Sequence, residues 1–257
     1  MLRRTFLHVA GIGRQTERKL WESGCSSWDD ALANPNLFSF GRADRAAVMQ
    51  ALRRSQQALD NREHQFFTRG LGLRDAWRVF PEFRDTILYL DIETDGPHVT
   101  VIGLYDGSSY QALARGVDLG NFADILSRYS VIVTFAGAMF DVPQLKRAFR
   151  NLLVDQIHID LCPTLRDIGV RGGLKKVEKL AGILRPDEVE GLNGYDAVRL
   201  WRRWDNLGDE ASLRRLIAYN REDVVNLERL MEWAYPQLVE AAVAGQAGRG
   251  KSVQSAG

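Results

Sequence analysis

A run of strand-forming residues that leads into acidic residues limits the folds of this chain most strongly. Residues 86–92 read Thr-Ile-Leu-Tyr-Leu-Asp-Ile and are rich in residue types that favour β-strands. The run is apolar on both alternating faces, which is typical of a strand that is covered on both sides of its sheet. We therefore predict a central β-strand at this position.

The segments after this run alternate between strand and helix patterns. Strands are predicted over 98–105, 109–114, 131–136 and 156–161, and helices over 122–129, from about Val142, and through most of the chain up to Ala234. The sequence Asp-Gly-Ser at 106–108 is typical of a hairpin turn, so the first three strands are expected to be antiparallel. This order predicts an α/β fold, a mixed sheet with flanking helices, and is compatible with an RNase-H-like core.

A helical and more basic segment precedes the sheet. Residues 42–66 are predicted to form a solvated helix with one buried stripe. Residues 1–84 hold 14 Lys and Arg against 9 Asp and Glu, whereas residues 85–257 hold 20 against 24, within a net charge of +1. We expect a small all-α domain over 1–84, the α/β domain over 85–240 and a disordered tail over 241–257.

The composition excludes several classes of protein. Hydrophobic residues make up 45% and charged residues 26% of the 257 positions, which excludes a mostly disordered chain, a collagen-like chain and a coiled-coil rod. Cys25 and Cys162 lie outside any cysteine–histidine cluster, so structural zinc is not expected. No apolar run approaches the ~20 residues that a membrane span needs, and no signal peptide is recognised, so we expect a cytoplasmic protein without a membrane partner.

Two carboxylates end the first predicted strand. Asp91 and Glu93 are two residues apart, and the period of a strand places both on one face of the sheet. Like charges at this spacing favour protonation unless a cation lies between them, and oxygen ligands suit Mg²⁺ or Mn²⁺. A solvated strand end is the alternative, but the apolar run that leads into the pair favours a site over the core.

Two later segments supply further acidic residues. Asp141 follows a strand and a glycine-containing turn, where capping a helix and pointing into a cleft are compatible roles. Tyr219 and Asp223 lie one helical turn apart and share a face that overlaps the apolar side of the predicted helix. A carboxylate directed toward the core needs a partner or a metal. The alternative is a tyrosine at the edge of the core beside an exposed aspartate.

Taken together, the three motifs resemble the DEDD superfamily of 3′–5′ exonucleases in its tyrosine-containing branch (DEDDy). The matching stretches are Leu90–Thr94, Thr134–Pro143 and Tyr219–Asp223. They are most similar to the YprB-like RNase-H-like family, and more distantly to the proofreading domain of B-family DNA polymerases. The resemblance covers about residues 85–235.

The resemblance implies a metal-dependent nuclease. By position, it assigns the binding of two divalent cations, Mg²⁺ or Mn²⁺, to four carboxylates, Asp91, Glu93, Asp141 and Asp223. It makes Tyr219 the residue that orients the attacking water, while the two ions activate that water and stabilise the leaving oxygen. Members of the family often carry Asn where this chain has Ala136, which puts contacts with the substrate in doubt more than catalysis.

The N-terminal segment carries a second motif. Residues 5–34 are predicted to form a helix, a tight turn at Gly11-Ile12-Gly13 and a second helix. Backbone N–H groups at such a turn bind phosphate, and the segment resembles the helix-hairpin-helix motif, which binds the DNA backbone. The expected contacts with nucleic acid are Gly11, Ile12, Gly13, Arg14, Thr16 and Lys19. A helical hairpin used for protein contact is the alternative.

Further basic and polar residues give less specific signals. Lys175 and Lys176 stand at a predicted helix start and are expected to contact nucleic acid, with a solvated face as the alternative. His158 and Asp160 alternate on a short strand and are expected to form a structural pair, with support of the acidic site as the alternative. The arginines within 199–203 are compatible both with a groove and with an amphipathic helix.

We therefore expect a two-domain 3′–5′ exonuclease that hydrolyses nucleic acid, with single-stranded DNA favoured and RNA left open. A structure-directed endonuclease and an RNA exonuclease of the same fold are the enzymatic alternatives. A non-catalytic nucleic-acid adaptor is the alternative from another class, and the presence of all four acids and the tyrosine argues against it.

Overall fold

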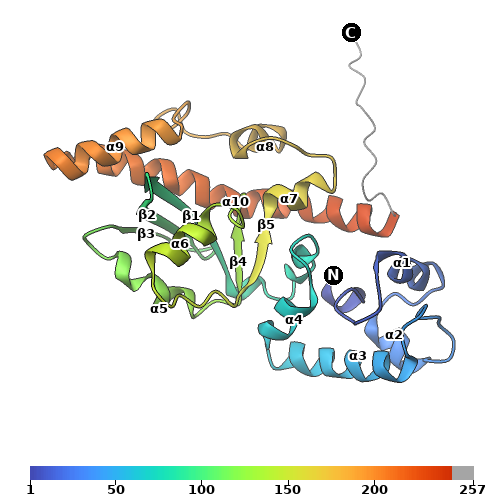
Figure 1. The fold of residues 1–257 in the computed structure, drawn as a ribbon. Helices are drawn as coiled ribbons and strands as arrows, with labels where there is room; N and C mark the ends of the chain where they lie inside the picture. Colours follow the sequence, from blue (N-terminus) through green and yellow to red (C-terminus); the bar gives the residue numbers. More distant parts are fainter. Residues whose placement is uncertain (245–257) are drawn as a thin grey trace, which may run out of the picture.

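A five-stranded mixed sheet forms the centre of the computed structural model, which describes residues 1–244 (Figure 1). The strands are β1 (Ile87–Asp95), β2 (His98–Tyr105), β3 (Tyr110–Ala114), β4 (Val131–Thr134) and β5 (Ile157–Asp160). Their order in the sheet is β3-β2-β1-β4-β5. The pairs β1–β2 and β2–β3 are antiparallel, whereas β1–β4 and β4–β5 are parallel. The predicted mixed sheet is confirmed, with β1 as its central strand.

Helices surround this sheet and also make up the N-terminal part of the chain. Before the sheet come the 3₁₀ helix η1 (Leu2–Arg4), then α1 (Arg14–Glu22), α2 (Trp28–Ala33), α3 (Arg45–Asp60), α4 (His64–Gly70), η2 (Ala76–Val79) and η3 (Arg84–Thr86). Between and after the strands come η4 (Leu119–Asn121), α5 (Phe122–Leu126), α6 (Asp141–Ala148), α7 (Leu161–Arg166), α8 (Leu174–Leu180), α9 (Gly194–Leu207) and α10 (Glu210–Ala244). Among residues 1–244, none of the helices has the length and apolar character needed to cross a membrane.

The last helix is longer than the sequence indicates. The helix α10 has 35 residues and continues to Ala244, so residues 241–244 are helical. The prediction that a disordered tail begins at residue 241 is therefore wrong. An alanine- and valine-containing run continues the helical pattern there. The rest of that predicted tail, residues 245–257, lies outside the described residues.

Alternate residues of β1 pack against different layers. Ile87 and Tyr89 belong to a core cluster that contains Leu227 and Leu230 of α10. Leu88 and Leu90 belong to the opposite cluster, which contains residues of α5 and α6. Because side chains alternate along a strand, Asp91 and Glu93 lie on the α10 face of β1.

The N-terminal helices share a core with α10. Trp77 and Phe80 pack on Tyr235, with ring centroids 5.9 Å and 5.5 Å apart. These residues and the N-terminal helices belong to one continuous hydrophobic cluster with β1 and the second half of α10. The helical part before β1 is therefore packed onto the sheet domain rather than joined to it only by a linker.

The helix predicted before the glycine turn does not form. The residues between η1 and α1 adopt successive turns. The carboxylate of Glu17 accepts hydrogen bonds from the Thr5 hydroxyl (2.6 Å) and the Phe6 N–H (2.7 Å), and the Trp28 indole donates to the Thr5 carbonyl oxygen (2.6 Å). These tertiary hydrogen bonds accompany an extended backbone at Thr5, and the helix-hairpin-helix prediction loses its first helix.

Candidate metal centre

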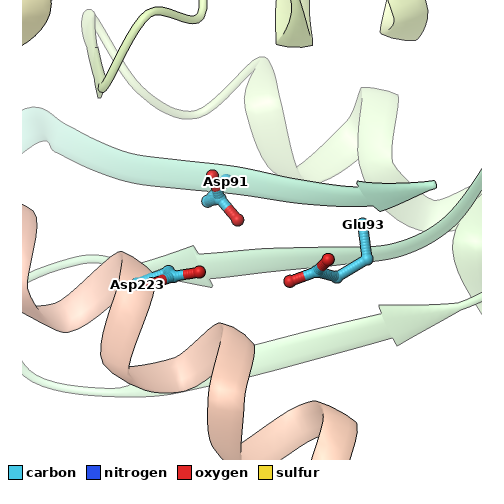
Figure 2. A group of neighbouring side chains, drawn as sticks. All are labelled: Asp91, Glu93 and Asp223. Atoms are coloured by element: carbon cyan, nitrogen blue, oxygen red, sulfur yellow. The ribbon is translucent and has the colours of Figure 1, made fainter. Parts of the chain in front are cut away.

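Three carboxylates meet where α10 packs on β1. Figure 2 shows Asp91 and Glu93 on β1 and Asp223 on α10 directed toward one another. Each offers one oxygen atom, and these oxygens lie within 4.8 Å of one another. The period-two spacing on the strand and the inward face of the helix therefore bring together three of the four acids that the sequence singles out, without Asp141.

Burial is the main cause that raises the pKa of each carboxylate in this group. Desolvation and the charges of Asp141, Asp223 and Glu93 hold the pKa of Asp91 well above its usual range. Burial and the charge of Asp223 raise the pKa of Glu93 to about 8. Buried carboxylates without enough positive charge favour their protonated forms, and a cation between them reverses that preference. A cation bound between these carboxylates would take the place of the protons that they otherwise keep.

Asp141 lies at the edge of this group. It is the first residue of α6, and its Oδ1 accepts a hydrogen bond from the Ile92 N–H at 3.1 Å. Its side chain is buried, and burial raises its pKa to about 7. Asp141 is thus inside the first turn rather than at the cap position, which Phe140 occupies, and its charge acts on the neighbouring Asp91.

Tyr219 lies one helical turn before Asp223, and both residues line a pocket beside the carboxylate group. This pocket has a volume of about 330 Å³, and its lining includes Asp91, Asp223, Tyr219 and Lys175. The Lys175 ammonium donates to the Tyr219 hydroxyl at 3.3 Å and lies 4.7 Å from the centre of its ring. Burial, followed by the charge of Asp223, raises the pKa of Tyr219, so its phenol keeps its proton at neutral pH.

The two lysines predicted to contact nucleic acid line this pocket. Lys175 and Lys176 both contribute to its wall at the start of α8. The ammonium of Lys175 also donates to the carbonyl oxygen of Leu192. Burial lowers the pKa of Lys175, although the charge of Asp223 acts in the opposite direction. A positive charge therefore lies beside the carboxylate group.

The glycine turn lies away from this pocket, near the C-terminal end of α10 (Figure 1). Gly11 has a φ of +83°, and Gly13 caps α1 without a side-chain hydrogen bond. Ile12 is buried in the core, which removes its side chain from any contact with a ligand. Arg14 forms ion pairs with Asp75 and Asp167 at 3.1 Å and 3.4 Å, whereas Lys19 is exposed and Thr16 half-buried.

The site contains an asparagine that the sequence analysis missed. Asn220 is fully buried, and its Nδ2 donates to Asp91 at 3.1 Å and to Glu93 at 3.5 Å. The Tyr110 hydroxyl donates to Asn220 Oδ1 at 2.9 Å, which fixes the amide. Asn220 lies three residues before Asp223, so helical spacing places both on one face and was an available signal.

A glycine makes room for this asparagine. Gly103 on β2 is the register partner of Asp91. A Cβ atom at Gly103 would lie 1.8 Å from Asn220 Oδ1, so a side chain there would displace Asn220. Arg185, in the loop after α8, is a second missed residue and contacts Asp223. No local pattern indicates Arg185, because only the fold brings that loop to α10.

The remaining polar candidates have structural partners. Asp160 accepts the N–H groups of Ala136 (2.7 Å) and Ala138 (3.0 Å), and His158 lies 2.8 Å from the Thr134 hydroxyl. These bonds support the turn after β4, where Ala136 has a φ of +65°. His158 and Asp160 each have structural partners, but these partners are other residues than the pair itself. The arginines of α9 form ion pairs with nearby acids, Arg199 with Asp196, Arg202 with Asp95 and Arg203 with Asp209.

The donor set fits a hard divalent cation. The ligand atoms of the group are all carboxylate oxygens, which Mg²⁺ and Mn²⁺ prefer over the nitrogen and sulfur ligands typical of zinc. The carboxylates lie in a partly buried site whose negative charges are only partly compensated. Their raised pKa values are the expected mark of a site that a cation would complete.

Comparison with known proteins gives one match. The family model described as the RNase H superfamily matches residues 88–235, which is more than half of the chain. The matched range runs from β1 into α10 and contains all three carboxylates of the group. No curated protein and no solved structure matches the chain. The chain belongs to the RNase H superfamily.

Proposed function

We propose that the protein is a metal-dependent 3′–5′ exonuclease that hydrolyses the phosphodiester bonds of nucleic acid, with single-stranded DNA as the favoured substrate. The observation that carries the proposal is the convergence of Asp91, Glu93 and Asp223 in one buried group. Membership of the RNase H superfamily supports a nuclease. The resemblance of the three motifs to DEDDy exonucleases supports the 3′–5′ polarity.

In this proposal, each acidic residue has a defined place. Asp91, Glu93 and Asp223 would hold two divalent cations, Mg²⁺ or Mn²⁺, with Asp141 as the fourth acidic ligand. When bound, such cations activate a water molecule and stabilise the leaving 3′-oxygen. Asn220 orients the carboxylates of β1 through its amide.

The other pocket residues would act on the water and the phosphate. Tyr219 keeps its proton, so it would orient the attacking water by a hydrogen bond rather than act as a base. Lys175 and Lys176 would contact the phosphate backbone from the wall of the pocket. These roles follow from the chemistry of the side chains and from their places around the carboxylates.

We also propose that the glycine turn contributes a second contact with the nucleic acid backbone. Gly13 leaves the first turn of α1 without a side-chain cap, and Lys19 is exposed on that helix. Contacts with phosphate make affinity fall as salt rises. Lys19→Ala is therefore expected to weaken DNA binding and to reduce its dependence on salt, with cleavage at saturating DNA retained.

The proposed activity is tested with 5′-labelled single-stranded DNA and purified protein in Mn²⁺. We expect a ladder of shortened products, which EDTA and Asp91→Ala abolish. Asp95→Ala is the matched control, because Asp95 lies on the same strand but pairs with Arg202 at the surface. This variant is expected to retain the ladder.

The same assay separates the alternatives. A 3′-blocked strand that stays intact supports an exonuclease, whereas internal cuts in that strand indicate an endonuclease. An RNA strand that is degraded faster than DNA would reverse the substrate preference. Protein that binds DNA in Mn²⁺ and Mg²⁺ but leaves it intact would contradict the enzyme and favour the adaptor.

A further inference from the structure

A buried arginine reaches the carboxylate group from outside the three sequence motifs. Arg185 lies in the loop between α8 and α9, and only 6% of its side chain is exposed. Its Nη2 donates to Asp223 Oδ1, and its Cζ lies 5.9 Å from the centre of the Tyr219 ring. The guanidinium thus contacts the one acid of the group that α10 supplies.

The guanidinium is itself fixed by a second acid. Nε and Nη2 of Arg185 donate to the two carboxylate oxygens of Glu178, each at 2.7 Å. This two-point contact of a planar guanidinium with a carboxylate restricts rotation of both groups. Glu178 belongs to α8, and its side chain is 2% exposed, so the pair is buried.

A third residue, Asn226, connects this pair to α10 by a hydrogen bond. Asn226 is fully buried, and its Nδ2 donates to Glu178 Oε1 at 3.0 Å. Asn226 lies three residues after Asp223 on the same helix. The chain of contacts therefore starts and ends on α10, so Arg185 and Glu178 are held against the helix face that carries Asp223.

The direction in which Asp223 points depends on this contact. Figure 2 shows its carboxylate directed toward Asp91 and Glu93. A hydrogen bond from a donor that is itself held in place limits the rotation of the carboxylate that accepts it. Arg185 is such a donor, because its Nη2 donates both to Glu178, which holds the guanidinium, and to Asp223.

We propose that Arg185 is a positioning residue of the metal site, and that Glu178 holds its guanidinium so that the Asp223 carboxylate faces Asp91 and Glu93. The inference rests on the proposed function, in which Asp223 binds a metal. A purely structural ion pair between α8 and its following loop is the competing explanation. Both explanations predict a loss of stability when one partner is removed, so stability alone does not separate them.

Two variants distinguish orientation from charge. Arg185→Lys keeps the positive charge but loses the planar two-point contact. The double variant Arg185→Gln/Glu178→Gln removes one positive and one negative charge together, so the net charge near Asp223 is unchanged. Arg202→Lys is the control, because Arg202 donates from Nε and Nη2 to one oxygen of Asp95 at the exposed surface, away from the metal site.

The test is the dissociation constant for Mn²⁺, measured by isothermal titration calorimetry without nucleic acid, with thermal melting in EDTA to verify folding. Loss of an outer partner of a metal ligand weakens binding by about ten- to a hundredfold. We expect this loss in Arg185→Lys and in the double variant, and an unchanged constant in Arg202→Lys. A folded Arg185→Lys or double variant with the Mn²⁺ affinity of the wild type would overturn the positioning role alone. A wild-type protein that binds no Mn²⁺ would overturn the proposed function, and this inference with it.

Discussion

At the scale of single residues, the carboxylates of the site oppose folding when no cation is present. Burial raises the pKa of Glu93 from an ordinary 4.5 to about 8 and that of Asp141 from 3.8 to about 7. In the folded state, these groups therefore keep protons that the unfolded chain has already lost. Because the folded state then binds more protons, stability falls as pH rises through this interval.

The contribution of Glu93 to stability can be measured directly. We expect the melting temperature in EDTA to fall more steeply between pH 4.5 and pH 8 in the wild type than in Glu93→Gln. The comparison cancels groups that both proteins share, such as His8, whose pKa is lowered to about 4 by burial and which acts in the opposite direction. Equal slopes for the two proteins would contradict the raised pKa of Glu93.

A bound divalent cation is expected to counteract this fall in stability with rising pH. Mn²⁺ and protons compete for the same carboxylates. Mn²⁺ therefore binds most tightly at high pH, where the fewest protons compete with it. The rise in melting temperature caused by saturating Mn²⁺ is therefore expected to be larger at pH 8 than at pH 6. The account would be contradicted by a rise that is equal at both pH values.

The acids of the site could be predicted from the sequence, but the arginine that contacts Asp223 could not. The pair Asp91 and Glu93 follows from the period of a strand, and Tyr219 and Asp223 follow from the period of a helix. Arg185 contacts Asp223 across 38 residues of sequence, and no local period links the two. Local sequence patterns thus predict which face of a strand or helix a residue occupies. The residues from other elements that contact that face depend on tertiary packing.

At the scale of elements, the approach of α10 to the sheet decides the geometry of the site. Gly103 on β2 lies under Asn220 of α10, and Val224 is also within 2.8 Å of a Cβ built on that glycine. The absence of a side chain at this one position of β2 lets the helix lie close to β1 and β2. The carboxylate of Asp223 reaches the strand acids only at that close approach.

Gly103→Ala is therefore expected to disturb both stability and metal binding. The added methyl group must displace the side chains of Asn220 and Val224 on α10, and overpacking of this kind costs about 1–3 kcal/mol. We expect a lower free energy of unfolding in urea and weaker Mn²⁺ binding. Gly120→Ala is the control, because a Cβ there meets no atom within 4 Å. Wild-type Mn²⁺ affinity in Gly103→Ala would show that the close approach is not needed.

Elements with strong local patterns were predicted correctly, and one element under tertiary control was not. The strand β1 and its antiparallel neighbours follow from alternation and from turn residues. The apolar stretch 6–10 lacks such a pattern. There the Glu17 carboxylate accepts hydrogen bonds from Thr5 and Phe6, the Trp28 indole donates to the Thr5 carbonyl oxygen, and the predicted helix does not form. Buried side chains outweighed the local preference of that short segment.

At the scale of the whole molecule, the N-terminal helices and the sheet are coupled through a common core. Trp77 and Phe80 precede the sheet, yet they pack on Tyr235 near the end of α10. Arg14 adds an ion pair with Asp167, which lies beyond the sheet in sequence. The basic segment before residue 85 and the acidic segment that follows it therefore meet along one interface.

This coupling predicts a single unfolding transition. Differential scanning calorimetry of the full chain is expected to give one peak, with equal calorimetric and van't Hoff enthalpies. A fragment that begins at residue 85 exposes the apolar surface under Trp77 and Phe80, so it is expected to melt at a lower temperature. Two separate peaks, or a fragment as stable as the full chain, would contradict the shared core.

The central claim is that Asp91, Glu93 and Asp223 gather to hold a divalent cation. The most direct measurement is the anomalous difference density of Mn²⁺ in crystals of the wild type and of Asp223→Asn. The account predicts strong density among the three carboxylates in the wild type, and weaker or absent density in the variant. Wild-type crystals with no density at these carboxylates at saturating Mn²⁺ would contradict the metal centre on which the proposed nuclease depends.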